Sequence, residues 1–198
     1  MHELAQHLVD LIFGWGYLGI FIMMAIESSF IPFPSEIVLV PAGYLASQGE
    51  MSIIMIMLSA LGGSLVGAFT NYYLALTLGR KFLLRYGKYF FIKEEALLKM
   101  EDFFTKHGHI STFTGRLIPG IRQLISIPAG LARMNLIEFS LFTALGAGIW
   151  ALVLTLLGYF IGENQALITQ YLREITLGVL VFLFILIVVY FKYQKSKR

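Results

Sequence analysis

Four charged side chains lie inside stretches of the sequence that are otherwise apolar. Glu27 and Glu36 flank the prolines of residues 32–34, and Arg116 and Arg122 flank residues 119–120. A cation in hydrocarbon costs about 2.5–3.5 kcal/mol on insertion scales, and lipid cannot repair a helical ladder that proline interrupts. Such residues are tolerated inside protein or beside a water-filled cavity. The pattern therefore predicts a site that handles ions or charged substrates.

The composition places this site in a membrane protein. The 198 residues are 58% hydrophobic and 14% charged, and the mean hydropathy is +0.77. We expect one polytopic membrane domain over residues 1–198, and no cleaved signal peptide because the N-terminus lacks a basic segment. The absence of cysteine excludes disulfides and thiolate metal sites. The four histidines have no carboxylate cluster beside them, so neither a metal nor a cofactor is expected.

The hydropathy pattern divides the chain into helical segments of two lengths. Residues 52–78 and 136–161 are long enough to span a membrane, and residues 176–193 are just long enough. Residues 11–47 and 109–133 are broken by prolines and are expected to form hairpins. Residues 80–107 alternate charges with apolar side chains and are expected to form an amphipathic cytoplasmic linker. The predicted fold is all-α.

Two motifs recur in order along the chain. Residues 41–43 (Pro-Ala-Gly) recur at 128–130, and residues 60–63 (Ala-Leu-Gly-Gly) return as Ala-Leu-Gly-Ala at 144–147. The offsets are 87 and 84 positions. Together they favour a duplicated unit of broken hairpin plus spanning helix, over residues 10–79 and 108–162.

The distribution of basic residues predicts the orientation. No Lys or Arg precedes Arg80, seven lie between Arg80 and Lys106, and four lie between Lys192 and Arg198. The positive-inside rule places both clusters in the cytoplasm. The two units would then be inverted, with re-entrant hairpins that meet near the midplane, the N-terminus outside and the C-terminus inside. The alternative is that residues 11–30 form a full span with the N-terminus inside.

The repeat also predicts how the charges pair. Subtracting 87 places Arg122 at Ser35, next to Glu36, and Arg116 at Ser29, two residues from Glu27. Two buried ion pairs are expected, each worth about 4 kcal/mol at a separation of about 4 Å and an effective dielectric of about 20. The backbone breaks of the hairpins are assigned to Pro32, Pro34, Pro41, Pro119, Gly120, Pro128 and Gly130. The expected cavity-lining residues are Asn71, Ser35 and Ser126.

Two interpretations of the charges stand side by side. In the first they are counter-ions that hold the hairpins together. In the second Arg116 and Arg122 bind the phosphate of an anionic lipid headgroup, while Glu27 and Glu36 carry protons or gate access. Asn71, which is expected to line the cavity, could equally cross-link helices by hydrogen bonds. The GxxxG pattern of residues 63–67 indicates close helix packing and allows a homodimer.

Several separated motifs together resemble the DedA family, also called SNARE-associated or VTT-domain proteins. The likeness covers residues 10–165. Its motifs are Glu27 with residues 30–36 (Phe-Ile-Pro-Phe-Pro-Ser-Glu), residues 41–43, 79–81 and 85–89, residues 104–108, residues 115–122 (Gly-Arg-Leu-Ile-Pro-Gly-Ile-Arg), residues 128–130, Met134, Phe139, Gly146, Trp150, Gly158 and Gly162.

The resemblance implies a multi-pass protein of the bacterial cytoplasmic membrane with two opposed re-entrant hairpins. It implies movement of lipids between leaflets, in some members coupled to the proton-motive force. The functional acids of that family map onto Glu27 and Glu36, and its arginines map onto Arg116 and Arg122. The branch that carries undecaprenyl phosphate is the most similar one.

These observations rank the functions. A transporter of a phosphate-bearing lipid comes first, with a phosphatidylethanolamine flippase or scramblase as its variant. A proton-coupled antiporter of small cations is second, and a purely structural module is third. An enzyme comes last, because the hairpins carry serine and threonine without a base. No catalytic residue is assigned, and no nucleic acid is expected because acidic residues interleave the basic stretch.

Overall fold

Every element that the computed structural model describes is helical. The described residues are 2–29, 34–79, 94–118 and 121–161, with single residues and pairs between 171 and 189. The helices are α1 (His2–Glu27), α2 (Glu36–Ser47), α3 (Ile53–Leu74), the π-helical turn η1 (Ala75–Gly79), α5 (Glu94–Leu117), α6 (Ser126–Leu131) and α7 (Leu136–Ile161). The predicted all-α class is confirmed at this level.

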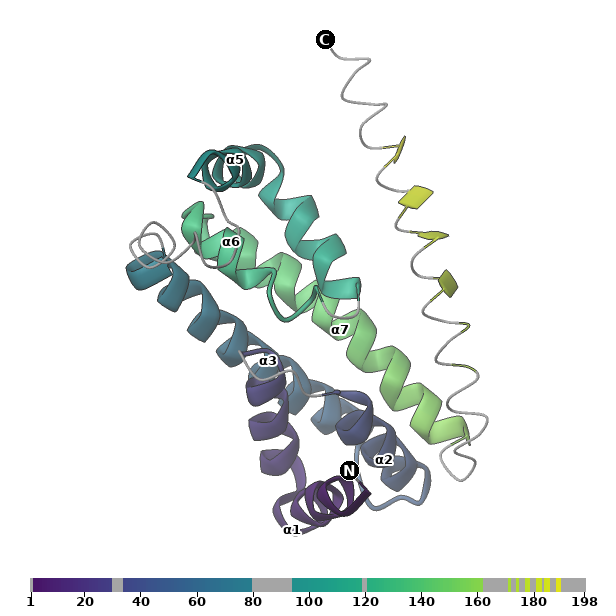
Figure 1. The fold of residues 1–198 in the computed structure, drawn as a ribbon. Helices are drawn as coiled ribbons and strands as arrows, with labels where there is room; N and C mark the ends of the chain where they lie inside the picture. Colours follow the sequence, from purple (N-terminus) through teal and green to yellow (C-terminus); the bar gives the residue numbers. More distant parts are fainter. Residues whose placement is uncertain are drawn as a thin grey trace.

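Two of the helices are long and apolar enough to cross a membrane. Ile53–Thr77 and Leu136–Phe160 each have 25 residues with a mean hydropathy of 2.0. At 1.5 Å per residue each is about 37 Å long, against a hydrocarbon core of about 30 Å. They lie where the sequence predicts its first two spans. α3 and α7 run side by side in opposite directions (Figure 1).

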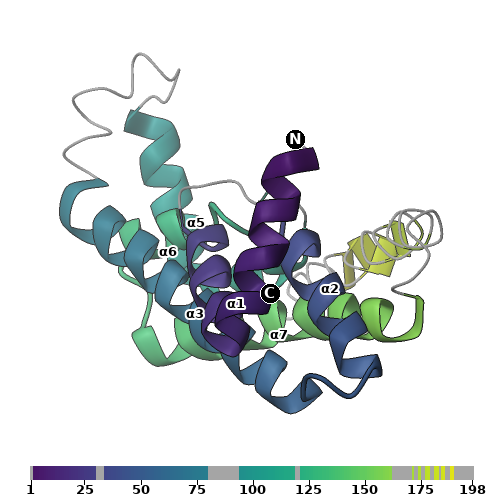
Figure 2. The same ribbon diagram turned by 90° about the horizontal axis from the view of Figure 1, so that it is seen from below.

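α1 consists of two helical parts with different directions (Figure 2). The change of direction occurs at Gly16, whose φ of 55° lies in the left-handed region that glycine tolerates. The apolar stretch Gly14–Glu27 is one of the described helical segments of 10–17 residues and is shorter than the two long helices.

The helices α1 to α3, before residue 80, are called here the first half, and α5 to α7, after residue 93, the second half. The helices of the two halves pack in matching pairs. α1 lies on α3 and α5 lies on α7, whereas α2 crosses α7 and α6 crosses α3. Glycines make the last two crossings close: a Cβ on Gly43 would meet the backbone oxygen of Thr155, and a Cβ on Gly130 would meet that of Tyr72. The two repeated Pro-Ala-Gly motifs therefore make equivalent contacts, each with the long helix of the other half.

The GxxxG pattern of α3 serves packing inside the chain. A Cβ on Gly63 would meet the backbone oxygen of Phe21, and one on Gly67 would meet that of Ala25. Both glycines are buried under α1. This face is therefore already covered, and the dimer that the pattern allowed cannot use it.

The structure corrects part of the assignment of backbone breaks. α2 continues through Pro41, and α6 contains both Pro128 and Gly130. Pro128 is the third residue of its helix, where the N–H has no partner within the helix, and Pro41 removes a single bond from the ladder. Pro34 lies two residues before α2, as expected of a break. The remaining assigned breaks lie outside the described residues: Pro32, Pro119 and Gly120.

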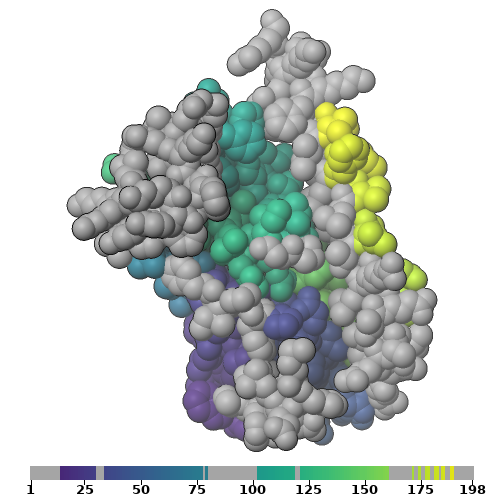
Figure 3. All heavy atoms as spheres, in the orientation of Figure 1, coloured from purple at the N-terminus to yellow at the C-terminus, as the bar shows by residue number. Residues whose placement is uncertain are grey.

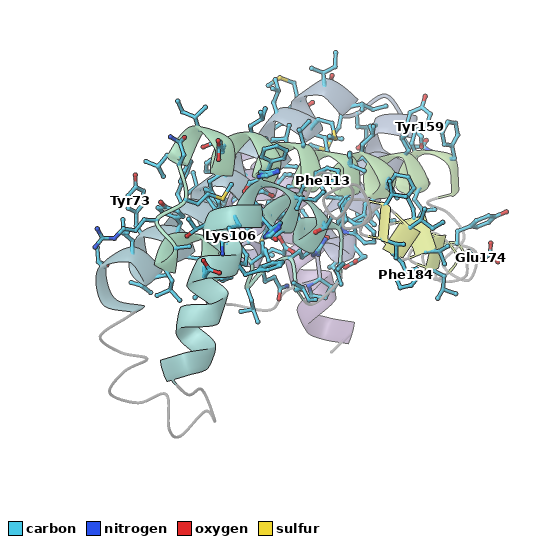
Figure 4. All side chains as sticks on the ribbon, turned by 90° about the horizontal axis from the view of Figure 1, so that it is seen from above. Tyr73, Lys106, Phe113, Tyr159, Glu174 and Phe184 are labelled. Atoms are coloured by element: carbon cyan, nitrogen blue, oxygen red, sulfur yellow. The ribbon has the colours of Figure 1, made fainter. Side chains whose placement is uncertain are left out.

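The elements at the edges of the bundle are described in part. α5 runs without a break through the boundary expected at residue 108, and residues 80–93 of the expected linker lie outside the described residues. The described residues of the expected final helix are helical and exposed, and Figure 3 shows them at one side of the molecule. The exposed aromatics Tyr73 and Tyr159, near the ends of the two long helices, lie at opposite ends of the bundle (Figure 4).

Candidate functional site

An arginine from the second half reaches two side chains of the first half. Arg122 lies in the turn between α5 and α6, and its Nη2 is 2.7 Å from Oε1 of Glu27 at the end of α1. The same Nη2 donates a hydrogen bond of 2.7 Å to Oγ of Ser35, directly before α2. The side chains of Arg122 and Glu27 are 10% and 4% exposed. The pair therefore joins the two halves inside the protein.

The carboxylate of Glu27 is held on its other side by its neighbour. Oγ of Ser28 donates a hydrogen bond of 3.0 Å to Oε2 of Glu27. The contact of Oε1 with Arg122 is close, but it does not have the alignment of a hydrogen bond. The two residues are therefore joined as an ion pair.

The second arginine is anchored by a hydroxyl group. Arg116 lies in the last turn of α5 and is 3% exposed. Its Nη2 donates a hydrogen bond of 2.8 Å to Oγ of Ser126, the first residue of α6. Its Nε has no partner among the described residues. The charges that act on it most strongly are those of Glu27 and Arg122, so the three groups form one electrostatic unit.

The pairing differs from the one that the repeat predicts. Arg122 meets Ser35, its counterpart 87 positions earlier, but its ion-pair partner is Glu27 and not Glu36. Ser35 already has a helical backbone conformation, and adjacent residues of a helix point about 100° apart, so Glu36 cannot share the direction of Ser35. Glu36 is half-buried and makes no ion pair with the described residues. Arg116 likewise binds Ser126 in place of a second carboxylate.

Asn71 connects the same two regions from α3. Its side chain is fully buried, and its Nδ2 donates to the backbone oxygen of Ser28 at 3.2 Å and to that of Gln123 at 3.1 Å. One amide group therefore links the end of α1 to the turn that carries Arg122. Its Oδ1 has no partner among the described residues. Of the two roles expected for Asn71, the structure places it as a cross-link.

Trp150 joins Glu27, Arg116 and Arg122 in one cluster, whereas the sequence alone indicates a packing aromatic or a residue of an interfacial belt. It is 4% exposed on α7, and its ring lies 5.5 Å from Cζ of Arg122, within the range of a cation–π contact. A signal was present: Trp150 lies in the middle of the span 136–161, whereas tryptophans of an interfacial belt lie near span ends.

The cluster carries two positive charges and one negative charge in an apolar interior. An anion would compensate the excess of one positive charge, and guanidinium groups suit the oxygens of a phosphate. The described residues contain no group of three His, Cys, Asp or Glu side chains that could hold a metal ion. The arrangement is therefore suited to binding and releasing an anionic group.

Comparison with known proteins relates the chain to bacterial membrane proteins. The VTT domain matches residues 33–160. The uncharacterized membrane protein YkoX of Bacillus subtilis is 39% identical over 198 residues, which are 100% of this chain and 88% of the relative. Undecaprenyl phosphate transporter A of the same organism is 32% identical, covering 98% and 96% of the two chains.

A third relative has a name that points elsewhere. An alkaline phosphatase-like protein of Lactococcus lactis is 38% identical, over 88% of this chain and 87% of the relative. No solved structure matches. The domain match and the long alignments establish that the chain belongs to the VTT-domain family, the DedA family of membrane proteins.

Proposed function

We propose that this protein moves a lipid with a terminal phosphate, most specifically undecaprenyl phosphate, between the leaflets of the bacterial cytoplasmic membrane. The observation that carries the proposal is the pair of buried guanidinium groups of Arg116 and Arg122 opposed by the single carboxylate of Glu27. A phosphate monoester carries about −1.5 to −2 charges, which match the two guanidinium charges once Glu27 is protonated. A relative named undecaprenyl phosphate transporter A supports the choice of lipid.

The ion pair suggests how the headgroup would enter. The phosphate and Glu27 compete for Arg122, because both offer oxygens to the same guanidinium. Protonation of Glu27 would remove its charge and release Arg122 to the phosphate. Proton entry and anion binding would thereby be coupled, and the proton-motive force could drive transport. Glu36, half-buried at the start of α2, is assigned to gating of the access path.

The architecture that we propose for transport is an inverted repeat. The matching contacts of α2 with α7 and of α6 with α3 support it, as do the opposite directions of α3 and α7. Residues 11–47 and 109–133 would be re-entrant hairpins, with the N-terminus outside and the C-terminus in the cytoplasm. Because the chain has no cysteine, single cysteines placed in residues 2–10 and 192–198 would report their side through labelling with an impermeant maleimide.

Reconstitution tests the function. Purified protein in vesicles of phosphatidylglycerol should exchange labelled undecaprenyl phosphate between leaflets. Arg122→Gln and Arg116→Gln should abolish exchange, whereas Lys106→Gln, at an exposed position, should retain it. Equal exchange by wild type and both arginine variants would refute the assignment of the site.

The same vesicles separate the alternatives. Exchange of phosphatidylethanolamine at the rate expected for undecaprenyl phosphate would indicate a scramblase of phospholipids. Proton flux driven by a cation gradient, without any added lipid substrate, would indicate an antiporter. Release of inorganic phosphate from undecaprenyl phosphate would indicate the hydrolytic activity that the name of the Lactococcus relative suggests. Each of these results, in the absence of undecaprenyl phosphate exchange, would replace the proposed function.

A further inference from the structure

Two buried hydrogen-bond donors of the cluster have no acceptor among the described residues. They are Nε1 of Trp150 and Nε of Arg116. The two residues are 4% and 3% exposed, so bulk water does not reach them. A buried indole N–H and a buried guanidinium N–H normally find a partner, because leaving them without one is costly. Both donors can therefore accept a partner from outside the described part of the chain, such as a bound anion.

The two donors lie along one side of α7. Gly146 precedes Trp150 by four residues, so both lie on the same side of the helix. A Cβ on Gly146 would lie 2.6 Å from Cβ of Arg116, so the base of the Arg116 side chain, from α5, packs on this glycine. Arg122 lies over the ring of Trp150 itself. Both arginines therefore meet this side of α7, one turn apart.

We propose that the indole N–H of Trp150 and the Nε–H of Arg116 donate to the terminal phosphate of the substrate and make the site selective for phosphate monoesters over phosphodiesters. The inference rests on the proposed function and deepens it. A monoester offers three terminal oxygens, which match the three donor groups Trp150, Arg116 and Arg122. In a diester the third oxygen carries a second alkyl group, so the donor that faces it meets a weak and sterically blocked acceptor, which weakens binding.

The ring of Trp150 has a second role in this site. Its face attracts the guanidinium group of Arg122. When a phosphate displaces Glu27, Arg122 therefore keeps one of its contacts and stays in place. Trp150 also packs in the apolar core cluster, so the test must separate its N–H from its packing.

Fluorescence gives a direct readout of Trp150. The chain contains two tryptophans, and the other, Trp15, is 55% exposed on α1. In the full chain carrying Trp15→Phe, emission comes from Trp150 alone. Titration in detergent with farnesyl phosphate should change this emission saturably. Farnesyl methyl phosphate, the matched diester, should bind at least about tenfold more weakly, the effect of one unmatched donor.

Two variants then remove one donor each. Trp150→Phe keeps an aromatic ring and loses the N–H, and Arg116→Lys keeps the charge and loses Nε. Calorimetric titration should show that each variant binds the monoester about tenfold more weakly and the diester unchanged, so that the preference between the two ligands disappears.

The outcomes distinguish the inference from the proposed function. If Trp150→Phe keeps the full preference for the monoester, the inference is overturned, while the proposed transport of the lipid stands. If Trp150→Phe does not fold, the same result in Arg116→Lys overturns it. An unchanged emission of Trp150 on binding would do the same. A wild-type protein that binds neither farnesyl ligand would remove the proposed function itself.

Discussion

The ion pair between Glu27 and Arg122 should contribute a large and specific coupling energy. Coulomb's law gives about 6 kcal/mol of gross attraction at the 2.7 Å separation and an effective dielectric of about 20, before desolvation is subtracted. Glu27→Gln alone strands a buried guanidinium and should lower the free energy of unfolding by about 3–5 kcal/mol. Arg122→Gln should cost a similar amount. The double variant still contains the buried charge of Arg116, but it removes the repulsion between the two guanidinium groups together with the ion pair, and it should cost less than the sum.

A second ion pair of the same chain supplies the control. Lys106 and Asp102 are 2.8 Å apart, but their side chains are 61% and 64% exposed. Their double-mutant cycle should give a coupling of about 0.5 kcal/mol or less, because water screens them. Unfolding is followed by far-ultraviolet circular dichroism as dodecyl sulfate is added to protein in dodecyl maltoside. Additivity within about 0.5 kcal/mol for the Glu27–Arg122 cycle would refute the claim that this pair holds the two halves together.

Three further substitutions test the packing and the anchors around the site. Gly43→Ala should destabilise the protein by about 1–3 kcal/mol in the same unfolding assay, because its Cβ would meet backbone of α7, whereas Gly14→Ala, with open space around it, should not. Asn71→Ala should cost about 1–3 kcal/mol by leaving two carbonyl groups without their donor, and the neighbouring Thr70→Ala, which loses only a bond within α3, should cost less. Ser126→Ala removes the hydroxyl that holds Arg116 and should slow lipid exchange in vesicles while helical content is retained. If Gly43→Ala or Asn71→Ala is as stable as the wild type, the contact described for that residue does not stabilise the fold. If Ser126→Ala exchanges lipid at the wild-type rate, its hydrogen bond to Arg116 is not needed for transport.

The long helices were the part of the fold that sequence could predict. Residues 52–78 and 136–161 are continuous apolar runs without internal prolines, so their length alone identifies them. The same reasoning misjudged Pro41, because the cost of one missing hydrogen bond is small when the rest of α2 packs tightly on α7. Whether a proline breaks a helix depends on tertiary contacts that a single sequence does not contain.

The membership of the site was predictable, but its pairing was not. Charged residues are rare in apolar stretches because placing a charge in the membrane interior costs free energy, so the sequence alone points to Glu27, Arg116 and Arg122. The choice of Glu27 over Glu36 as the partner of Arg122 depends on the rotation of α2 about its axis. The place of Trp150 in the middle of a span sets it apart from an interfacial tryptophan, but the sequence does not show what it contacts. Its contact with Arg122 and an indole N–H without a partner among the described residues assign it to the site.

The binding of a lipid phosphate by the buried arginines can be seen in an experimental structure in nanodiscs that contain undecaprenyl phosphate. We expect phosphate density within hydrogen-bonding distance of both Arg116 and Arg122, with Glu27 displaced from Arg122. Phosphate density confined to the headgroup region, with the contact between Arg122 and Glu27 intact in every particle class, would contradict it.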